Sequence, residues 1–184
     1  MPGKYVFPGG RTESHDARRM VTHEGHPATV QKLQIGMRRW PSNARARGLL
    51  TAAIRETFEE TGLLIGHHAI GNDLDLSGLI YFARAVTPPG HARRFDSRFF
   101  VCDARIVTNL DEPHALASPE LLALKWVTLP QALDLNLPSI TKDILLLLEP
   151  FLSAGTLPDP GCPVSFHHKL GKSWIVEFLS HAET

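Results

Sequence analysis

The stretch from Leu50 to Leu64 constrains the fold of this chain most, because its residues divide between two faces of one helix. At about 100° per residue, apolar side chains fall on one side and carboxylates on the other. The apolar side holds Leu50, Ile54 and Phe58, and the acidic side holds Glu56, Glu59 and Glu60. Gly62 most readily adopts the left-handed conformation that ends a helix. The sequence therefore predicts a helix with one buried face and three carboxylates in its last turns.

Carboxylates near the end of a helix are unfavourable on their own. They meet the negative end of the helix dipole and repel one another, which costs roughly a few tenths of a kcal/mol per contact. A divalent cation would reverse the sign, because Mg²⁺ prefers hard oxygen ligands and is usually held by a few carboxylates together with substrate phosphates. A solvated acidic face is the alternative, since charge clusters on helices are common. The pattern by itself is compatible with both.

The order of residues in this helix resembles a known motif. The string Arg55-Glu56-Thr57-Phe58-Glu59-Glu60-Thr61-Gly62-Leu63 matches the second half of the Nudix box, Arg-Glu-apolar-x-Glu-Glu-x-Gly-apolar, except that Thr57 replaces the apolar residue. The chain thus resembles the Nudix hydrolases, which use divalent metal to cleave a nucleoside diphosphate linked to another group. The resemblance implies Mg²⁺ or Mn²⁺ as the cofactor. It also implies a small-molecule nucleoside diphosphate derivative as the substrate.

A short segment near the start supplies part of the other half of the motif. Residues 4–7 are rich in β-formers and predict a strand that Pro8, Gly9 and Gly10 stop. Glycines allow a ligand to approach the backbone closely, although an ordinary hairpin turn fits the same residues. The first half of a Nudix box is Gly, five residues and Glu. Here Gly10 and five residues lead to Asp16, a shorter carboxylate.

The motif is interrupted by a long insertion. Between Asp16 and Arg55 lie 38 residues, where the family has a much shorter spacer. From about residue 17 to 47 we expect surface structure or a specificity loop, with one short helix within residues 28–40. The arginines of this insertion, Arg38, Arg39, Arg45 and Arg47, either help to hold a phosphorylated substrate or are solvated surface residues.

The resemblance implies a role for each site residue. Glu56, Glu59 and Glu60 would bind metal, with a backbone carbonyl at Gly9 or Gly10, and Arg55 would orient Glu56. An activated water would attack phosphorus with a glutamate as base. Glu56 is one candidate base. The other is a loop acid, for which Glu120 is the first choice and Glu112 the second.

The downstream sequence predicts a hairpin, two helices and an irregular end. Residues 76–86 and the segment from 98 to 104 read as strands joined by a turn. A strand over residues 122–127, with Trp126 in the core, precedes helices that begin near Thr128 and at Ser139. The second helix has an apolar face, formed by Ile140, Ile144, Leu147, Leu148 and Phe151. From about residue 155 we expect an irregular tail with one strand at residues 173–178.

Two strings narrow the resemblance to one branch of the family. Arg93-Arg94-Phe95-Asp96-Ser97-Arg98-Phe99-Phe100 resembles the coenzyme A and acyl-coenzyme A diphosphatases with a long insertion in the box, and Gly3 followed by Phe7-Pro8-Gly9-Gly10 resembles the end of their motif. Arg93 and Arg94 would then bind phosphate, because arginine donates forked hydrogen bonds. Pairing with Asp96 or another surface acid is their alternative. The expected substrate is coenzyme A or an acyl-coenzyme A; ADP-ribose, NADH and a non-catalytic binding role are the alternatives.

Composition excludes several other classes of protein. The formal net charge is zero, with 19 basic and 19 acidic side chains, which does not support charge-driven binding of nucleic acid or a membrane surface. The longest apolar run, Ile144 to Leu148, is too short to span a bilayer. The two cysteines have neither zinc-site nor disulfide spacing. We expect one cytoplasmic domain over residues 1–184.

The alternation of strands and helices favours an α/β fold, and the resemblance implies an α/β/α sandwich with a mixed sheet over about residues 3–150. Related proteins usually have one or two strands before the Phe-Pro-Gly-Gly turn, whereas few residues precede it here. We therefore expect either a start placed too late or a natural truncation. A missing strand would leave an exposed sheet edge, which favours pairing with another chain, for example in a homodimer.

Overall fold

The computed structural model describes residues 3–37, 39–66, 73–90, 93–111, 124–171 and 173–180. Its helices are α1 (Pro27–Gln34), α2 (Asn43–Thr61), α3 (Leu129–Asp134) and α4 (Ser139–Ser153), with short 3-10 helices η1 (Asp16–Arg18) and η2 (Ala104–Ile106). Its strands are β1 (Val21–His23), β2 (Leu74–Asp75), β3 (Ile80–Val86), β4 (Asp96–Val101), β5 (Val164–Leu170) and β6 (Ser173–Leu179).

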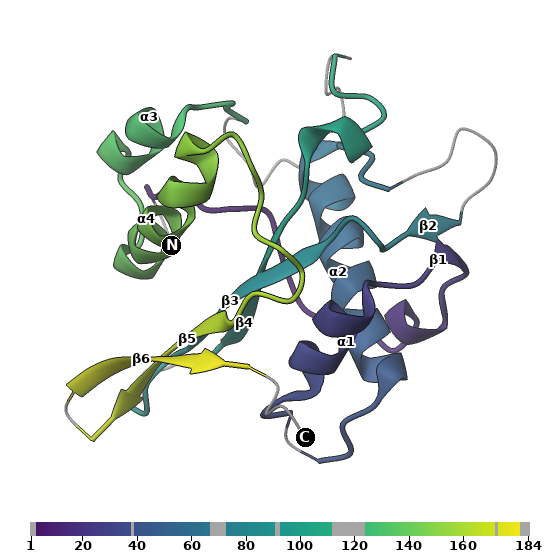
Figure 1. Ribbon diagram of the computed structural model, residues 1–184, viewed down its shortest axis with the longest axis horizontal. Coiled ribbons are helices and arrows are strands. Elements are labelled where there is room, and N and C mark those ends of the chain that lie inside the picture. The colour runs from purple at the N-terminus through teal and green to yellow at the C-terminus, as the bar shows by residue number, and fades with distance from the viewer. Residues whose placement is uncertain are drawn as a thin grey trace.

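These elements form the predicted α/β sandwich around a mixed sheet. The main sheet has the strand order β4-β3-β5-β6, in which β3 and β5 are parallel and the outer pairs are antiparallel. Helices α1 and α2 lie on one side of the sheet, and α3 and α4 lie on the other (Figure 1). Strands β1 and β2 form a separate parallel pair. None of the helices in the described ranges has the length and apolarity needed to cross a bilayer.

Helix α2 ends as predicted but begins earlier. Gly62 has a φ of 75°, and its N–H donates to the Phe58 carbonyl at 2.8 Å, which closes the helix in the left-handed conformation. At the other end, Ser42 accepts a hydrogen bond from the Arg45 N–H and caps the helix. The first turns of α2 therefore belong to the insertion, which the Nudix-type motif does not cover.

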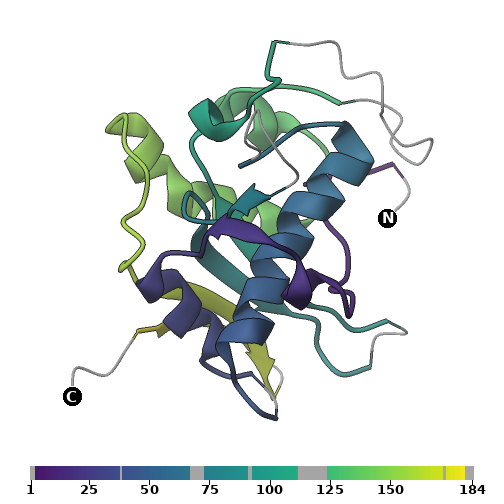
Figure 2. The same ribbon diagram turned by 90° about the vertical axis from the view of Figure 1, so that its right-hand side faces the viewer.

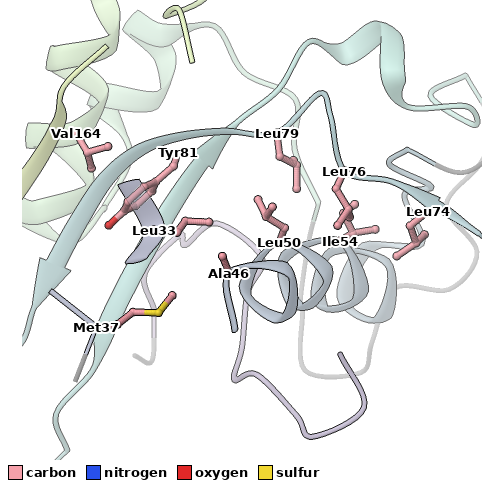
Figure 3. Packing of buried hydrophobic residues seen from close by; sticks show 10 residues of the cluster. All are labelled: Leu33, Met37, Ala46, Leu50, Ile54, Leu74, Leu76, Leu79, Tyr81 and Val164. Carbon is pink, nitrogen blue, oxygen red and sulfur yellow. The ribbon is translucent and has the colours of Figure 1, made fainter. Parts of the chain in front are cut away.

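The larger core cluster lies between α2 and the start of β3. Ala46, Leu50 and Ile54 of α2 face Leu76 and Leu79, as Figure 3 shows from close by. The cluster also contains Leu33, Met37, Leu74, Tyr81 and Val164. Of the apolar face predicted for the helix, Leu50 and Ile54 are buried and Phe58 is only partly buried, and the acidic side chains of α2 lie elsewhere on the helix.

A second cluster confirms the apolar face predicted for α4. Ile144 is buried against Phe82 and Ala83 of β3, and the rings of Phe82 and Phe151 meet edge to face with centroids 6.2 Å apart. Ile140, Leu147, Leu148 and Phe151 pack around this cluster. The spacing of these residues places them on one stripe of a helix, which explains why the sequence pattern identifies it.

The C-terminal segment corrects one prediction. The irregular tail predicted from about residue 155 is wrong over Val164–Leu170, where β5 forms a hairpin with β6 and pairs with β3 in the middle of the sheet. Strand β6 was predicted. Strand β5 was not, because its buried positions include the polar Ser165 and His167 and therefore give no apolar alternation.

Two predicted strands are absent from the part of the chain that the structure describes. Residues 4–7 are extended without a ladder, and the Tyr5 N–H donates instead to the Asn136 carbonyl at 3.1 Å. Residues 124–127 form no strand either, and Trp126 is 63% exposed, not part of the core. β-forming residues become a strand only where a neighbouring strand offers hydrogen-bond partners, and these two segments have none in the described sheet.

The insertion folds onto both α2 and the C-terminal segment. It contains η1, β1, α1 and the start of α2, and α1 is the one short helix predicted within it. The Thr29 hydroxyl donates to the Leu79 carbonyl, and the buried Lys32 ammonium donates to the Cys162 carbonyl just before β5. The insertion is thus part of the packed structure and not only a surface loop.

Candidate active site

The glycine turn lies directly against the acidic end of α2. The Gly9 N–H donates to Glu60 Oε2 at 3.0 Å. At Gly10, an added Cβ would lie 2.2 Å from the Glu56 carboxyl carbon, so that any other residue would displace this carboxylate. Two segments far apart in the chain therefore meet where the sequence predicted a site.

Arg55 is the centre of the contacts in this region. Its Nη1 donates to Glu56 Oε1 at 3.0 Å and to Glu59 Oε2 at 2.9 Å. Its Nε and Nη2 donate to the two carboxylate oxygens of Asp16, at 2.9 and 3.2 Å, and Nη2 also donates to the Arg11 carbonyl. The guanidinium group thus uses its full set of N–H donors. Arg55 orients Glu56, as expected, and Glu59 as well.

Asp16 is completely buried, and its role is larger than the sequence suggested. The Glu13 N–H donates to Asp16 Oδ2 at 2.7 Å. Burial opposes ionisation of Asp16, but hydrogen bonds from Arg55 and Glu13 and the charge of Arg55 hold the pKa of this carboxyl below its usual range. The hydrogen bonds to Asp16 in turn raise the pKa of Arg55. A buried, forked ion pair therefore closes the insertion onto the acidic helix.

The one departure from the motif within the helix has a local explanation. Thr57 is buried, and its hydroxyl donates to the Ala53 carbonyl at 2.8 Å. This bond satisfies the polar group, so that Thr57 occupies a position where the family has an apolar residue. After the helix, Asn109 accepts from the Leu64 N–H at 2.8 Å and donates to the Gly62 carbonyl at 2.9 Å. We did not predict this contact, since Asn109 belongs to no motif.

The charge balance of the cluster favours a cation. Arg55 contributes one positive charge, and Asp16, Glu56, Glu59 and Glu60 contribute four negative charges, which leaves three negative charges in one small region. The oxygen atoms available as metal ligands belong to carboxylates and backbone carbonyls, the ligand type that Mg²⁺ and Mn²⁺ prefer. The residues present therefore fit a hard divalent cation by chemistry and by charge.

The side-chain arrangement itself is not one of metal ligation. Among the described residues, no three His, Cys, Asp or Glu side chains are grouped so as to hold a metal ion. Glu56 and Glu59 instead bind Arg55, and Glu60 accepts from Gly9. Metal binding would require carboxylates to turn from these partners, and the side chain of Glu59, which is 53% exposed, has room to do so.

The two arginines proposed for substrate binding lie elsewhere. Arg93 and Arg94 are exposed in the turn between β3 and β4, where Arg94 Nε donates to the Thr87 carbonyl. Figures 1 and 2 both place this turn away from the C-terminal end of α2. Asp96, which we considered as their ion-pair partner, instead binds Arg84 and Arg98. The structure does not bring Arg93 and Arg94 together with the acidic residues.

The predicted site residues therefore fall into three groups. Gly9, Gly10, Arg55, Glu56, Glu59 and Glu60 lie together. Arg93 and Arg94 lie apart from them. Glu120 and Glu112, the proposed loop acids, lie outside the described residues.

Comparison with known proteins supports the fold. No protein-family model matches the sequence, and no curated protein matches it. Among solved structures, the chain is similar to the crystal structure of a NUDIX hydrolase from Alicyclobacillus acidocaldarius, with 24% sequence identity and a TM-score of 0.55. The similarity covers 79% of this chain and 75% of that one. The chain therefore has the fold of a Nudix hydrolase, as its motif predicted.

Proposed function

We propose that this chain is a metal-dependent hydrolase that cleaves a nucleoside diphosphate linked to another group. The observation that carries the proposal is the packing of the Gly9–Gly10 turn against Glu56 and Glu60 of α2, with Arg55 holding Glu56 and Glu59. Glu56, Glu59, Glu60 and the Gly10 carbonyl would hold the Mg²⁺ or Mn²⁺. When bound, the ion supplies Lewis acidity to the phosphoryl group.

The chain's own residues would position the reactants. Arg55 fixes Glu56 through a 3.0 Å hydrogen bond, and Gly10 leaves space beside that carboxylate. Glu56 would accept a proton from the attacking water, with Glu120 as the alternative base. The water oxygen forms a bond to one phosphorus while the bridging P–O bond breaks, so that two phosphate monoesters leave.

For the substrate we propose coenzyme A or an acyl-coenzyme A, cut to 3′,5′-ADP and a 4′-phosphopantetheine product. Two strings of the sequence support this choice, and the exposed Arg93 and Arg94 are available to a phosphate remote from the bond that breaks. Coenzyme A carries a 3′-phosphate that ADP-ribose and NADH lack. ADP-ribose or NADH is the second candidate, and a non-catalytic binding protein is the third.

A comparison of substrates tests the proposal. We expect kcat/KM with Mg²⁺ or Mn²⁺ to be higher for coenzyme A than for dephospho-coenzyme A, ADP-ribose or NADH. Faster cleavage of ADP-ribose or NADH would assign the enzyme to the second candidate. Retained nucleotide binding without turnover of any of these compounds would favour the third.

Two variants test the metal ligands. Glu59→Gln and Glu60→Gln should each remove most of the activity, because they keep the size of the side chain and lose its charge. Glu24→Gln is the matched control, since Glu24 pairs with Arg47 in the insertion and outside the site. The fold should persist, because the Glu59 side chain is half exposed and Arg55 keeps Asp16 and Glu56 as partners. Near-normal turnover by both site variants would refute the assignment.

A further inference from the structure

Strand β6 leaves a large apolar surface at one edge of the sheet. It pairs with β5 on one side, and no strand lies beside its other edge in the described part of the chain. Trp174 and Phe178 are each 61% exposed, and Val176 is 49% exposed. These residues alternate along the strand and therefore share one face of the sheet.

We call Trp174, Val176 and Phe178 the exposed stripe. The stripe lies on the same face of the sheet that α4 covers at other strands. Val176 and Phe178 lie opposite His167 and Ser165 of β5, and these two residues lie opposite Ala85 and Ala83 of β3. Ala83 is buried in the cluster beneath α4. That cluster draws on β3 and β4, so that α4 covers the part of the sheet formed by these two strands and not the stripe on β6.

Strand β6 carries few of the features that usually protect a free edge. Natural edge strands carry Lys, Pro, bulges or inward charges that prevent pairing with another chain. From Ser173 to Leu179 there is neither Lys nor Pro, and the seven pairs with β5 are in regular register. The one charge is Glu177, whose carboxylate lies 3.0 Å from His168 Nε2. Such an edge is suited to a partner strand.

We propose that β6 pairs antiparallel with β6 of a second copy of this chain and joins the two sheets into one. Full overlap of the strand places the two-fold axis at Val176. Trp174 then lies opposite Phe178 of the second copy, and Val176 lies opposite its own equivalent, so that the two stripes form one apolar surface. Glu177 lies opposite Ile175 of the second copy, so no like charges face each other. This self-complementarity favours a second copy over an unrelated protein, and the inference does not depend on the proposed function.

The oligomeric state of the full chain tests the pairing. Sedimentation or light scattering should show a dimer for the natural sequence, and Val176→Lys should yield folded monomers, since it places two lysines opposite each other. Leu170→Lys is the matched control: Leu170 is 68% exposed in the same hairpin, pairs with Ser173 and lies on the opposite face, so the dimer should persist. A natural chain that is monomeric at every concentration would overturn the proposal, as would a dimer that Val176→Lys leaves intact.

Crosslinking tests the register without relying on a destabilising change. Directly opposed residues of antiparallel strands have Cα atoms about 4.5–5.5 Å apart, within reach of a disulfide. Under mild oxidation, Val176→Cys should give a covalent dimer. Glu177→Cys should not, because the axis at Val176 places it opposite Ile175. The natural chain, which contains Cys102 and Cys162, measures the background crosslinking through these two cysteines. Equal crosslinking of both variants, or crosslinking of neither, would exclude this register.

Discussion

Arg55 determines how Glu56 and Glu59 of α2 are held. Its guanidinium group binds Asp16 on its buried side and Glu56 and Glu59 toward the surface. The motif identifies Arg55 and the three glutamates from sequence, because they lie within two turns of one helix. It does not show that Asp16 is the buried partner, since that contact spans 39 positions and depends on how the insertion folds.

We predict that Asp16→Ala destabilises the protein by about 3 kcal/mol, because it leaves a buried guanidinium without its main partner. Asp16→Glu, which introduces the carboxylate found in the family's motif, should lose less. Urea denaturation measures both values. An Asp16→Ala protein as stable as the natural chain would show that the ion pair makes no net contribution.

A second residue-scale prediction concerns His167, which is buried and whose Nε2 has no hydrogen-bond partner among the described residues. Burial lowers the pKa of His167, and the charge of Asp143 acts in the opposite direction. Between the lowered pKa and the unfolded value of about 6.5, the unfolded chain binds more protons. Stability should therefore be complete above pH 6.5 and fall as the pH decreases. His167→Gln should reduce this fall in stability at acid pH, as measured by urea denaturation. The same pH dependence of stability in the variant and the natural chain would contradict this role of His167.

At the scale of elements, the glycine turn and helix α2 meet in the candidate site because the turn has no side chain where the helix presents Glu56. Elements with a regular apolar stripe, such as α4, could be predicted from the sequence. Strand β5 could not, because its place in the sheet depends on pairing with β3 and not on its own pattern. Residues 4–7 show the converse, since β-forming residues without a partner remain irregular.

We predict that Gly10→Ala weakens Mn²⁺ binding with little loss of stability. The new methyl group would meet the Glu56 carboxylate, which is the far end of a flexible side chain and can move. Gly25→Ala provides the contrast, because its methyl group would lie 2.4 Å from Leu50 Cδ1 in the core and should lower stability by about 1–3 kcal/mol. Calorimetric titration and thermal unfolding separate the two effects. Unchanged Mn²⁺ affinity in Gly10→Ala would argue against a role for the turn.

For the whole molecule, the insertion connects the acidic helix to the C-terminal hairpin. The Lys32 ammonium is buried and bonded to the Cys162 carbonyl. Burial lowers the pKa of Lys32, while Cys162 and Asp159 act in the opposite direction. This contact could not be predicted from the sequence, because a lysine on a helix is usually a surface residue.

We predict that Lys32→Met loosens the hairpin of β5 and β6, because it leaves the Cys162 carbonyl without its donor, at a cost of about 1–3 kcal/mol. Hydrogen exchange should be faster at the amides of Val164–Leu170. Lys169→Met, at an exposed position of the same hairpin, should leave exchange unchanged. Equal protection in both variants would show that the contact does not hold the hairpin.

The position of β5 in the sheet has a consequence for biosynthesis. Strand β3 leaves the ribosome together with its hairpin partner β4, but the strand that covers its other edge is synthesised only after α3 and α4. Until then, the backbone N–H and C=O groups along this edge of β3 have no partner strand, and the apolar side chains of Phe82 and Ala83 lie on the same strand. The nascent chain therefore passes through a stage with an exposed interior edge, the kind of intermediate that chaperones bind.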